Sequence, residues 1–193
     1  NGTDADVKWF DIDPCYVFHP MNAFEDGKKI VVDVCRMATA MKPGTSSPPM
    51  LYRWSIDLDK GSVTETQLDD RSVEFPRICD TKVGVKNRYG YAAAFADGLP
   101  AAGGYIKYDM DNGTSALHDL KGGMGSEPVF VKDPNGKEED DGWVLSYVYQ
   151  PEFDKSEVSI IDSRAFDDGP IARIHLPVRV PYGFHGNWIP DGY

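Results

Sequence analysis

Short apolar runs separated by turn residues dominate the chain, and this pattern predicts an all-β protein. Residues 51–56 and 105–108 alternate between apolar and polar side chains, as half-buried strands do. Further runs are rich in β-branched and aromatic residues, which fit a pleated strand; they lie at 16–18, 29–34, 129–131, 143–149, 158–161 and 171–174. No long window keeps the period of about 3.6 residues that marks an amphipathic helix.

The breaks between these runs carry the residues that tight hairpins need. Residues 59–61, 111–113 and 133–136 each combine Asp or Asn with a closing glycine, which supplies the positive φ of such turns. Regular hairpins at this spacing indicate a sandwich, a barrel or a propeller, and the spacing alone does not choose among them. A propeller blade takes about 40–45 residues, so a propeller of this length would hold about four blades.

Composition narrows the classes of partner. The 193 residues are 41% hydrophobic and 12% aromatic, which is enough to bury a core. The net charge is -11, whereas nucleic-acid binding needs clustered Lys and Arg, so we expect no nucleic-acid partner. No segment approaches the roughly 18 consecutive apolar residues of a membrane-spanning helix. Peripheral contact with a membrane stays open.

The cysteines and the N-terminal residues give two further expectations. Cys15, Cys35 and Cys79 are odd in number and form no C-x-x-C pair, which argues against a disulfide framework or a zinc ribbon and favours a reducing, cytoplasmic location. The chain has no initiating Met and opens directly into an apolar stretch at 7–10. We therefore expect residues 1–193 to be the C-terminal portion of a single domain whose N-terminal portion is missing.

Two of the four histidines lie in unusual local sequences. His19 follows a predicted strand and enters a polar bend, and His185 has glycines on both sides that let the backbone approach closely. A lone histidine is more often a structural residue than a metal ligand, so these settings alone leave metal binding open. We expect His118 to be a loop residue and His175 to lie on an outer strand.

Five motifs, in order along nearly the whole chain, resemble those of the carotenoid cleavage oxygenase family. One such motif would be weak, but an ordered set is specific. The segment that is similar to Gly-Glu-Pro-Val-Phe-Val departs by one residue, Ser126. The motifs are FHPMNAFE at 18–25 followed by VDVCR at 32–36, EFPRI at 74–78, GSEPVFV at 125–131, EEDDGW at 138–143 and RVPYGFHGNW at 179–188.

This resemblance implies a fold and a metal site. The family fold is a seven-bladed β-propeller with a ferrous ion held on its axis by four histidines. His19 and His185 would be the third and fourth ligands, with Glu74 and Glu127 accepting hydrogen bonds from them. The first two ligands and a third glutamate would lie upstream. Without the resemblance, Glu74 would be a surface ion-pair residue and Glu127 a cap at the end of a strand.

The resemblance also implies a reaction. Fe(II) and O2 would split one C=C bond of a carotenoid, an apocarotenoid or a stilbene into two carbonyl products. Phe18, Phe24 and Phe184 flank the expected ligands and are candidates for the wall of an apolar substrate tunnel. Two alternatives stay open: an isomerase of retinyl-ester type that does not use O2, and an inactive or truncated propeller that serves as a binding module.

Overall fold

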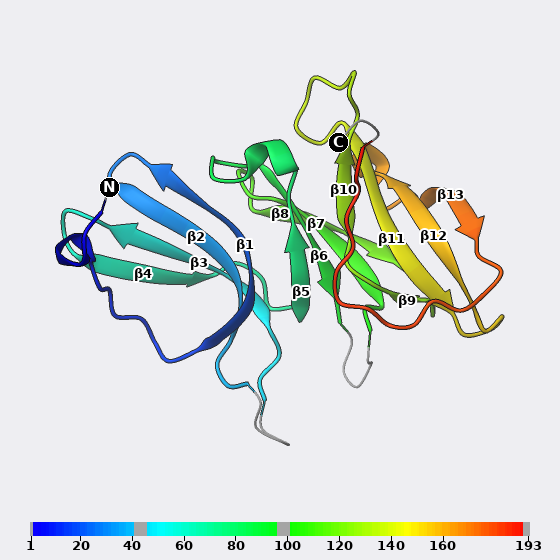
Figure 1. Ribbon diagram of the computed structural model, residues 1–193, viewed down its shortest axis with the longest axis horizontal. Coiled ribbons are helices and arrows are strands. Elements are labelled where there is room, and N and C mark those ends of the chain that lie inside the picture. The colour runs from blue at the N-terminus through cyan, green and yellow to red at the C-terminus, as the bar shows by residue number, and fades with distance from the viewer. Residues whose placement is uncertain (1, 41–45, 96–100, 191–193) are drawn as a thin grey trace.

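The computed structural model describes residues 2–40, 46–95 and 101–190, which form three antiparallel sheets side by side (Figure 1). Helical geometry in these residues is confined to three 3-10 turns, and none of them reaches the length or apolarity of a membrane-crossing helix. The all-β prediction is confirmed. The turns are η1 (Asp4–Asp6), η2 (Asp80–Lys82) and η3 (Ser163–Ala165).

The strands follow one another in simple order within each sheet. The first sheet is β1 (Tyr16–Asp26), β2 (Lys29–Met37), β3 (Met50–Asp57) and β4 (Ser62–Gln67). The second is β5 (Val73–Arg77), β6 (Tyr89–Ala94), β7 (Gly104–Asp109) and β8 (Thr114–Asp119). The third is β10 (Val129–Lys132), β11 (Gly142–Gln150), β12 (Lys155–Asp162) and β13 (Pro170–His175), with the short β9 (Met124–Gly125) also paired to β11.

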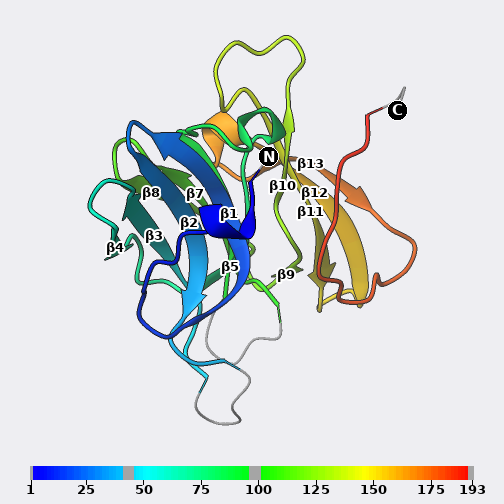
Figure 2. The same ribbon diagram turned by 60° about the vertical axis from the view of Figure 1, so that its left-hand side comes forward.

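Three sheets are present where the sequence predicted about four blades, so that count is not confirmed. The sheets occupy residues 16–67, 73–119 and 124–175, and each is longer than the roughly 40–45 residues assumed for a blade. The terminal stretches explain most of the difference, since residues 2–15 and 176–190 belong to no strand. Figure 2 shows the third sheet apart from the first two, which overlap in that view, and the described residues close no ring.

The predicted hairpin turns are confirmed. Gly61 between β3 and β4 has φ 65°, and Gly113 between β7 and β8 has φ 64°, a region that side chains disfavour. The third predicted turn, at 133–136, lies between β10 and β11. Cys15, Cys35 and Cys79 are free thiols.

The surroundings of His19 differ from the prediction. His19 lies inside β1 rather than after a strand, because β1 continues through Pro20 to Asp26. The pairing of β1 with β2 shifts register on both sides of Pro20. A proline cannot donate to the ladder and is tolerated at such bulges, where the strand bends and side chains are re-aimed. The bend predicted after His19 is therefore a bulge within a strand.

The central strands of the second sheet, β6 and β7, are buried on both faces. On β6, Tyr91 packs in a cluster with third-sheet residues, whereas its neighbour Ala92 packs in a cluster with first-sheet residues. On β7, Tyr105 and Ile106 divide in the same way. Successive side chains of a strand point to opposite faces, so neighbouring residues enter different cores. The segment at 105–108, predicted to be half-buried, is instead enclosed by two sheets.

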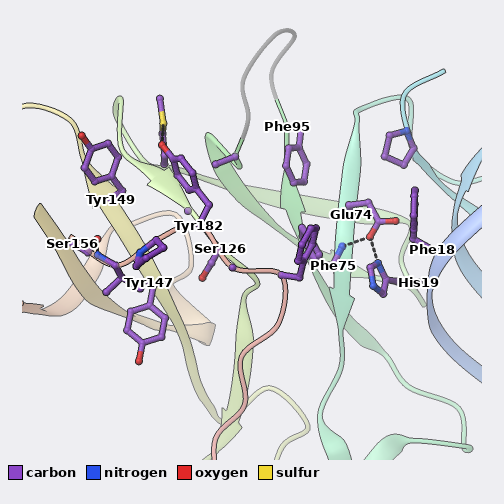
Figure 3. A pocket seen from close by; sticks show the side chains of 18 of the residues that line it. Phe18, His19, Glu74, Phe75, Phe95, Ser126, Tyr147, Tyr149, Ser156 and Tyr182 are labelled. Carbon is purple, nitrogen blue, oxygen red and sulfur yellow. Dashed lines mark hydrogen bonds and ion pairs between the residues drawn. The ribbon is translucent and has the colours of Figure 1, made fainter. Parts of the chain in front are cut away.

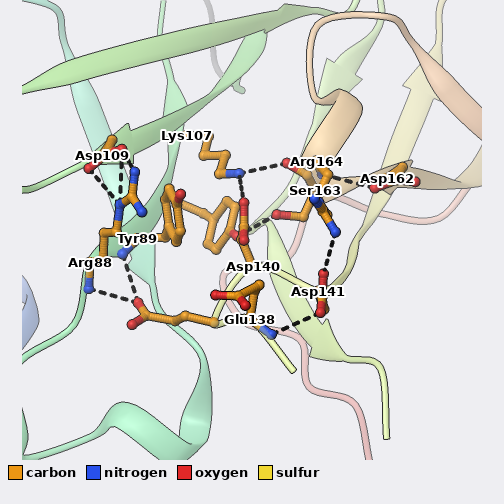
Figure 4. A network of polar contacts seen from close by, with 12 residues as sticks. Arg88, Tyr89, Lys107, Asp109, Glu138, Asp140, Asp141, Asp162, Ser163 and Arg164 are labelled. Carbon is orange, nitrogen blue, oxygen red and sulfur yellow. Dashed lines mark hydrogen bonds and ion pairs between the residues drawn. The ribbon is translucent and has the colours of Figure 1, made fainter. Parts of the chain in front are cut away.

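A polar seam fixes the third sheet against the second (Figure 4). Lys107 Nζ donates to Asp140 Oδ2 at 2.6 Å and to the Ser163 carbonyl oxygen at 2.8 Å. The same ammonium lies 4.3 Å from the centre of the Tyr89 ring, and Tyr91 shares a hydrogen bond of 2.6 Å with Ser163 Oγ. These contacts join the two sheets that carry the carboxylates described next.

Candidate metal centre

The rings of His19 and His185 meet although the residues are 166 positions apart. Their Nε2 atoms are 3.2 Å apart, and the ring planes are inclined at 79°. His19 comes from β1, and His185 from the segment after β13, drawn in red in Figure 1, which runs back from the third sheet toward the second. The structure thus brings both predicted ligands to one point.

Glu74 holds His19 from behind. Its Oε2 lies 2.6 Å from His19 Nδ1 and also accepts the backbone N–H of Phe75 at 2.5 Å (Figure 3). The glutamate side chain is buried, and its Oε1 has no hydrogen-bond partner in the described part of the chain. Glu74 is therefore not a surface ion-pair residue.

Glu127 holds His185 more loosely. It lies between β9 and β10 and is buried, with Oε1 at 3.4 Å from His185 Nδ1. Its Oε2 accepts the backbone N–H of Gly186 at 2.9 Å, and Arg77 Nη1 lies 3.5 Å from Oε1. The structure thus places both predicted carboxylates behind the predicted histidines.

Phe75, a residue of β5, packs its ring against both histidines, and the sequence analysis missed it. Its ring centre lies 5.3 Å from that of His19 and 5.7 Å from that of His185. Its φ is 53°, in the left-handed region that costs a residue with a side chain about 1–2 kcal/mol. The β5–β6 pairing shifts register between Glu74 and Arg77, so this residue forms a bulge. Its place directly after Glu74 was the available signal.

The donor set fits one transition-metal ion. A carboxylate can only accept, so Glu74 and Glu127 select the Nδ1–H form of each neutral imidazole and leave both Nε2 lone pairs facing the same point. Two nitrogen ligands at about 2.1 Å from a metal, at about 90–109°, stand roughly 3.0–3.4 Å apart, which matches the observed 3.2 Å. Imidazole suits Fe, Zn, Cu and Ni. No group of three or more candidate ligands occurs within the ranges that the structure describes.

A cavity of about 460 Å³ opens beside His19 (Figure 3). Phenylalanines line the end near the histidine, and tyrosine and serine side chains line the other end. The phenylalanines are Phe18, Phe75, Phe95 and Phe184, and the hydroxyl-bearing residues include Ser126, Tyr147, Tyr149, Ser156 and Tyr182. Aromatic walls with a few polar groups are typical of sites for small apolar molecules.

Two expectations from the sequence are not met. Phe24 does not line this cavity, because it lies six residues beyond Phe18 on β1 and its side chain is buried elsewhere. His118 lies in β8, not in a loop, and is buried with Nδ1 at 3.1 Å from the Phe166 carbonyl oxygen. Burial lowers the pKa of His118. His175 ends β13 and is exposed, as predicted for an outer strand.

Comparison with known proteins identifies the family of this chain. A family profile described as "Retinal pigment epithelial membrane protein" matches residues 1–190. The carotenoid cleavage oxygenase of Mycobacterium tuberculosis is 39% identical over 205 residues, which cover 98% of this chain and 40% of that protein. The apocarotenoid-15,15'-oxygenase of Synechocystis is 31% identical over 198 residues, which cover 95% of this chain and 40% of that protein.

Solved structures show the same arrangement of sheets. The crystal structure of cobalt-substituted Synechocystis ACO superposes with a TM-score of 0.85 at 30% identity, covering 92% of this chain and 40% of that one. An ACO/RPE65 chimera gives a TM-score of 0.85 at 29% identity, with the same coverage of 92% and 40%. The chain thus spans about 40% of the length of these relatives. It belongs to the family that contains the carotenoid cleavage oxygenases and the retinal pigment epithelial membrane protein.

Proposed function

We propose that the protein carrying this chain is a non-heme Fe(II) dioxygenase that splits a C=C bond of a carotenoid, apocarotenoid or stilbene. The observation that carries this proposal is the 3.2 Å approach of His19 Nε2 to His185 Nε2, each ring backed by a buried glutamate. Relatives named as carotenoid and apocarotenoid oxygenases support the reaction class. Bound ferrous iron would supply O2 activation.

His19 and His185 would hold the ion, and the glutamates would prepare them for it. Neutral imidazole ligands leave the 2+ charge of the metal uncompensated. Glu74 and Glu127 contact these imidazoles from the side away from the ion, and so place negative charge directly behind them. The same carboxylates fix which ring nitrogen faces the ion. Loss of such a partner typically weakens metal binding or activity about 10–100-fold.

The phenylalanine-lined end of the cavity would hold the reacting double bond. A polyene offers few hydrogen-bonding groups, so its binding depends on removing apolar surface from water. Phe18, Phe75 and Phe184 supply such surface beside His19. Their rings would also keep bulk water away from the reacting carbon atoms and so limit side reactions.

The test uses the natural full-length protein, prepared with Fe(II) and given an apocarotenal or a stilbene. We expect O2 uptake to match substrate loss, with label from ¹⁸O₂ in the carbonyl products at early times. The His19→Ala variant should consume no O2 beyond the background rate. Product formed without O2 uptake would contradict the proposal and favour the isomerase alternative.

A further inference from the structure

We propose that Arg77 is a positioning residue of the metal centre. This proposal rests on the proposed function only where the experiment measures metal binding. Arg77 connects the second sheet to Glu127 and to Asn187, and so fixes the segment that carries His185.

The backbone of Arg77 is well placed to act as a fixed point. It is the last residue of β5 and pairs with Tyr91, a fully buried residue of the second sheet. Its side chain is only 21% exposed. The guanidinium therefore leaves the second sheet from a defined position, three residues after Glu74.

The guanidinium contacts three separate parts of the chain. Nη1 lies 3.5 Å from Glu127 Oε1, and Nη2 donates to Asn187 Oδ1 at 3.1 Å. Nη2 also lies 3.7 Å from Asp80 Oδ1. An arginine has several N–H donors in one plane and can serve two acceptors at once, which the single ammonium of lysine does less well.

The segment around His185 depends on these contacts because it belongs to no strand. Its earlier part is held near Val180, whose N–H donates to Ser156 Oγ at 2.9 Å. For the described residues 185–188, the hydrogen bonds and ion pairs that reach the sheets go to Glu127 or to Arg77, apart from the ring contact of His185 with His19. Besides the ring contacts of His185 with His19 and Phe75, these two side chains hold the segment in place.

Arg77 also stabilises Glu127 itself. Glu127 is buried, and a buried carboxylate without a cation or sufficient hydrogen bonds is costly. Among the described residues, the Lys or Arg side chain that forms an ion pair with Glu127 is that of Arg77. Without Arg77, Glu127 would lose this partner and Asn187 its link to the second sheet. We then expect the segment to loosen and His185 Nε2 to move away from His19.

The experiment compares Arg77→Gln with the wild type in the natural full-length protein. Amide exchange of metal-free protein, read by mass spectrometry of peptides covering 183–190, should rise about tenfold or more at the hydrogen-bonded amides of Gly186 and Trp188 and stay unchanged in the three sheets. A Co(II) titration, followed through the visible absorption of the bound ion, should show a Kd about 10–100-fold higher. Arg77→Lys should restore part of both.

Two further variants make the result specific. Arg164→Gln is the matched control, since Arg164 is 64% exposed and pairs with Asp141 at 3.0 Å, away from the site; it should change neither readout. Asn187→Ala alters an exposed residue and should also raise exchange in 183–190. Combined with Arg77→Gln, it should add less than the sum of the single effects, because the two residues share one contact.

Unchanged exchange in 183–190 for Arg77→Gln would overturn the proposal, and so would a rise spread over all three sheets. If the wild type binds neither Fe(II) nor Co(II), the proposed function fails. In that case, a rise in exchange confined to 183–190 in Arg77→Gln would still support the proposal that Arg77 fixes this segment. Failure of the proposed function and failure of the Arg77 proposal therefore give different results.

Discussion

The two halves of the candidate metal centre are built in different ways. His19 lies within a strand, and its carboxylate partner lies on the next sheet at 2.6 Å. His185 lies on a segment without regular structure, and its partner is 3.4 Å away and shared with Arg77. Strand pairing and register place the first half, whereas a few side-chain bonds place the second. The second half is therefore the one that a surface substitution can disturb.

Removing either histidine should have the largest effect. His19→Ala and His185→Ala should each weaken Fe(II) binding by more than the roughly 100-fold that loss of a carboxylate partner can cause. The halves should differ in metal-free stability, because His19→Ala leaves the buried Glu74 without its imidazole and should cost about 1–3 kcal/mol. Urea unfolding and anaerobic titration measure the two effects.

The control for both is His175→Ala, at an exposed histidine on β13. It should leave Fe(II) binding unchanged. Equal loss of stability in His19→Ala and His185→Ala would show that the two halves do not differ in the way described.

The carboxylates should rank in the same order. Glu74→Gln should weaken Fe(II) binding by close to 100-fold, and Glu127→Gln by closer to tenfold, because the His185 contact is longer and its acceptor is already shared. Isothermal titration under anaerobic conditions gives both constants. The reverse ranking would mean that contact length in this centre does not reflect the strength of support.

Phe75 lies against both halves. Its left-handed backbone should make glycine more stabilising than alanine at this position, the reverse of the usual order. At φ 53°, Phe75→Gly should be more stable than Phe75→Ala by about 1 kcal/mol, since only glycine adopts this conformation without cost. Urea unfolding of the two variants measures the difference. At Phe184, which has no positive φ, alanine should be at least as stable as glycine.

The smallest effect concerns a histidine outside both halves. Burial lowers the pKa of His118 below its ordinary value of 6.5, so the unfolded state binds more protons just below that pH. The stabilisation from a neutral His118 is present above pH 6.5 and is lost as pH falls toward the folded-state pKa. Thermal unfolding between about pH 7.5 and 5 should show a smaller decline for His118→Gln than for the wild type.

Local patterning predicted the hairpins but not how they are joined. Turn chemistry at Gly61 and Gly113 depends on neighbouring residues alone, so it could be identified from the sequence. The continuation of β1 through Pro20 could not, because a bulge depends on the partner strand. The double burial of β6 and β7 was also missed, since it needs two neighbouring sheets.

The part of the site that lies within the family motifs could be predicted from the sequence. The resemblance identified two histidines and two glutamates: His19, His185, Glu74 and Glu127. The structure brings these four residues together, and their binding of iron stays a prediction. Phe75 and Arg77 were missed because their roles depend on a left-handed backbone and on contacts 50 to 110 positions away, which no local pattern encodes.

The 166 positions between the two histidines have a consequence for biosynthesis. Translation delivers His19 and Glu74 before His185, so the contact between the first two can form before His185 is made. Closing a loop of that length costs roughly 4–5 kcal/mol of chain entropy, most of which folding of the second and third sheets offsets beforehand. The approach of His185 to His19 would therefore follow the folding of these two sheets.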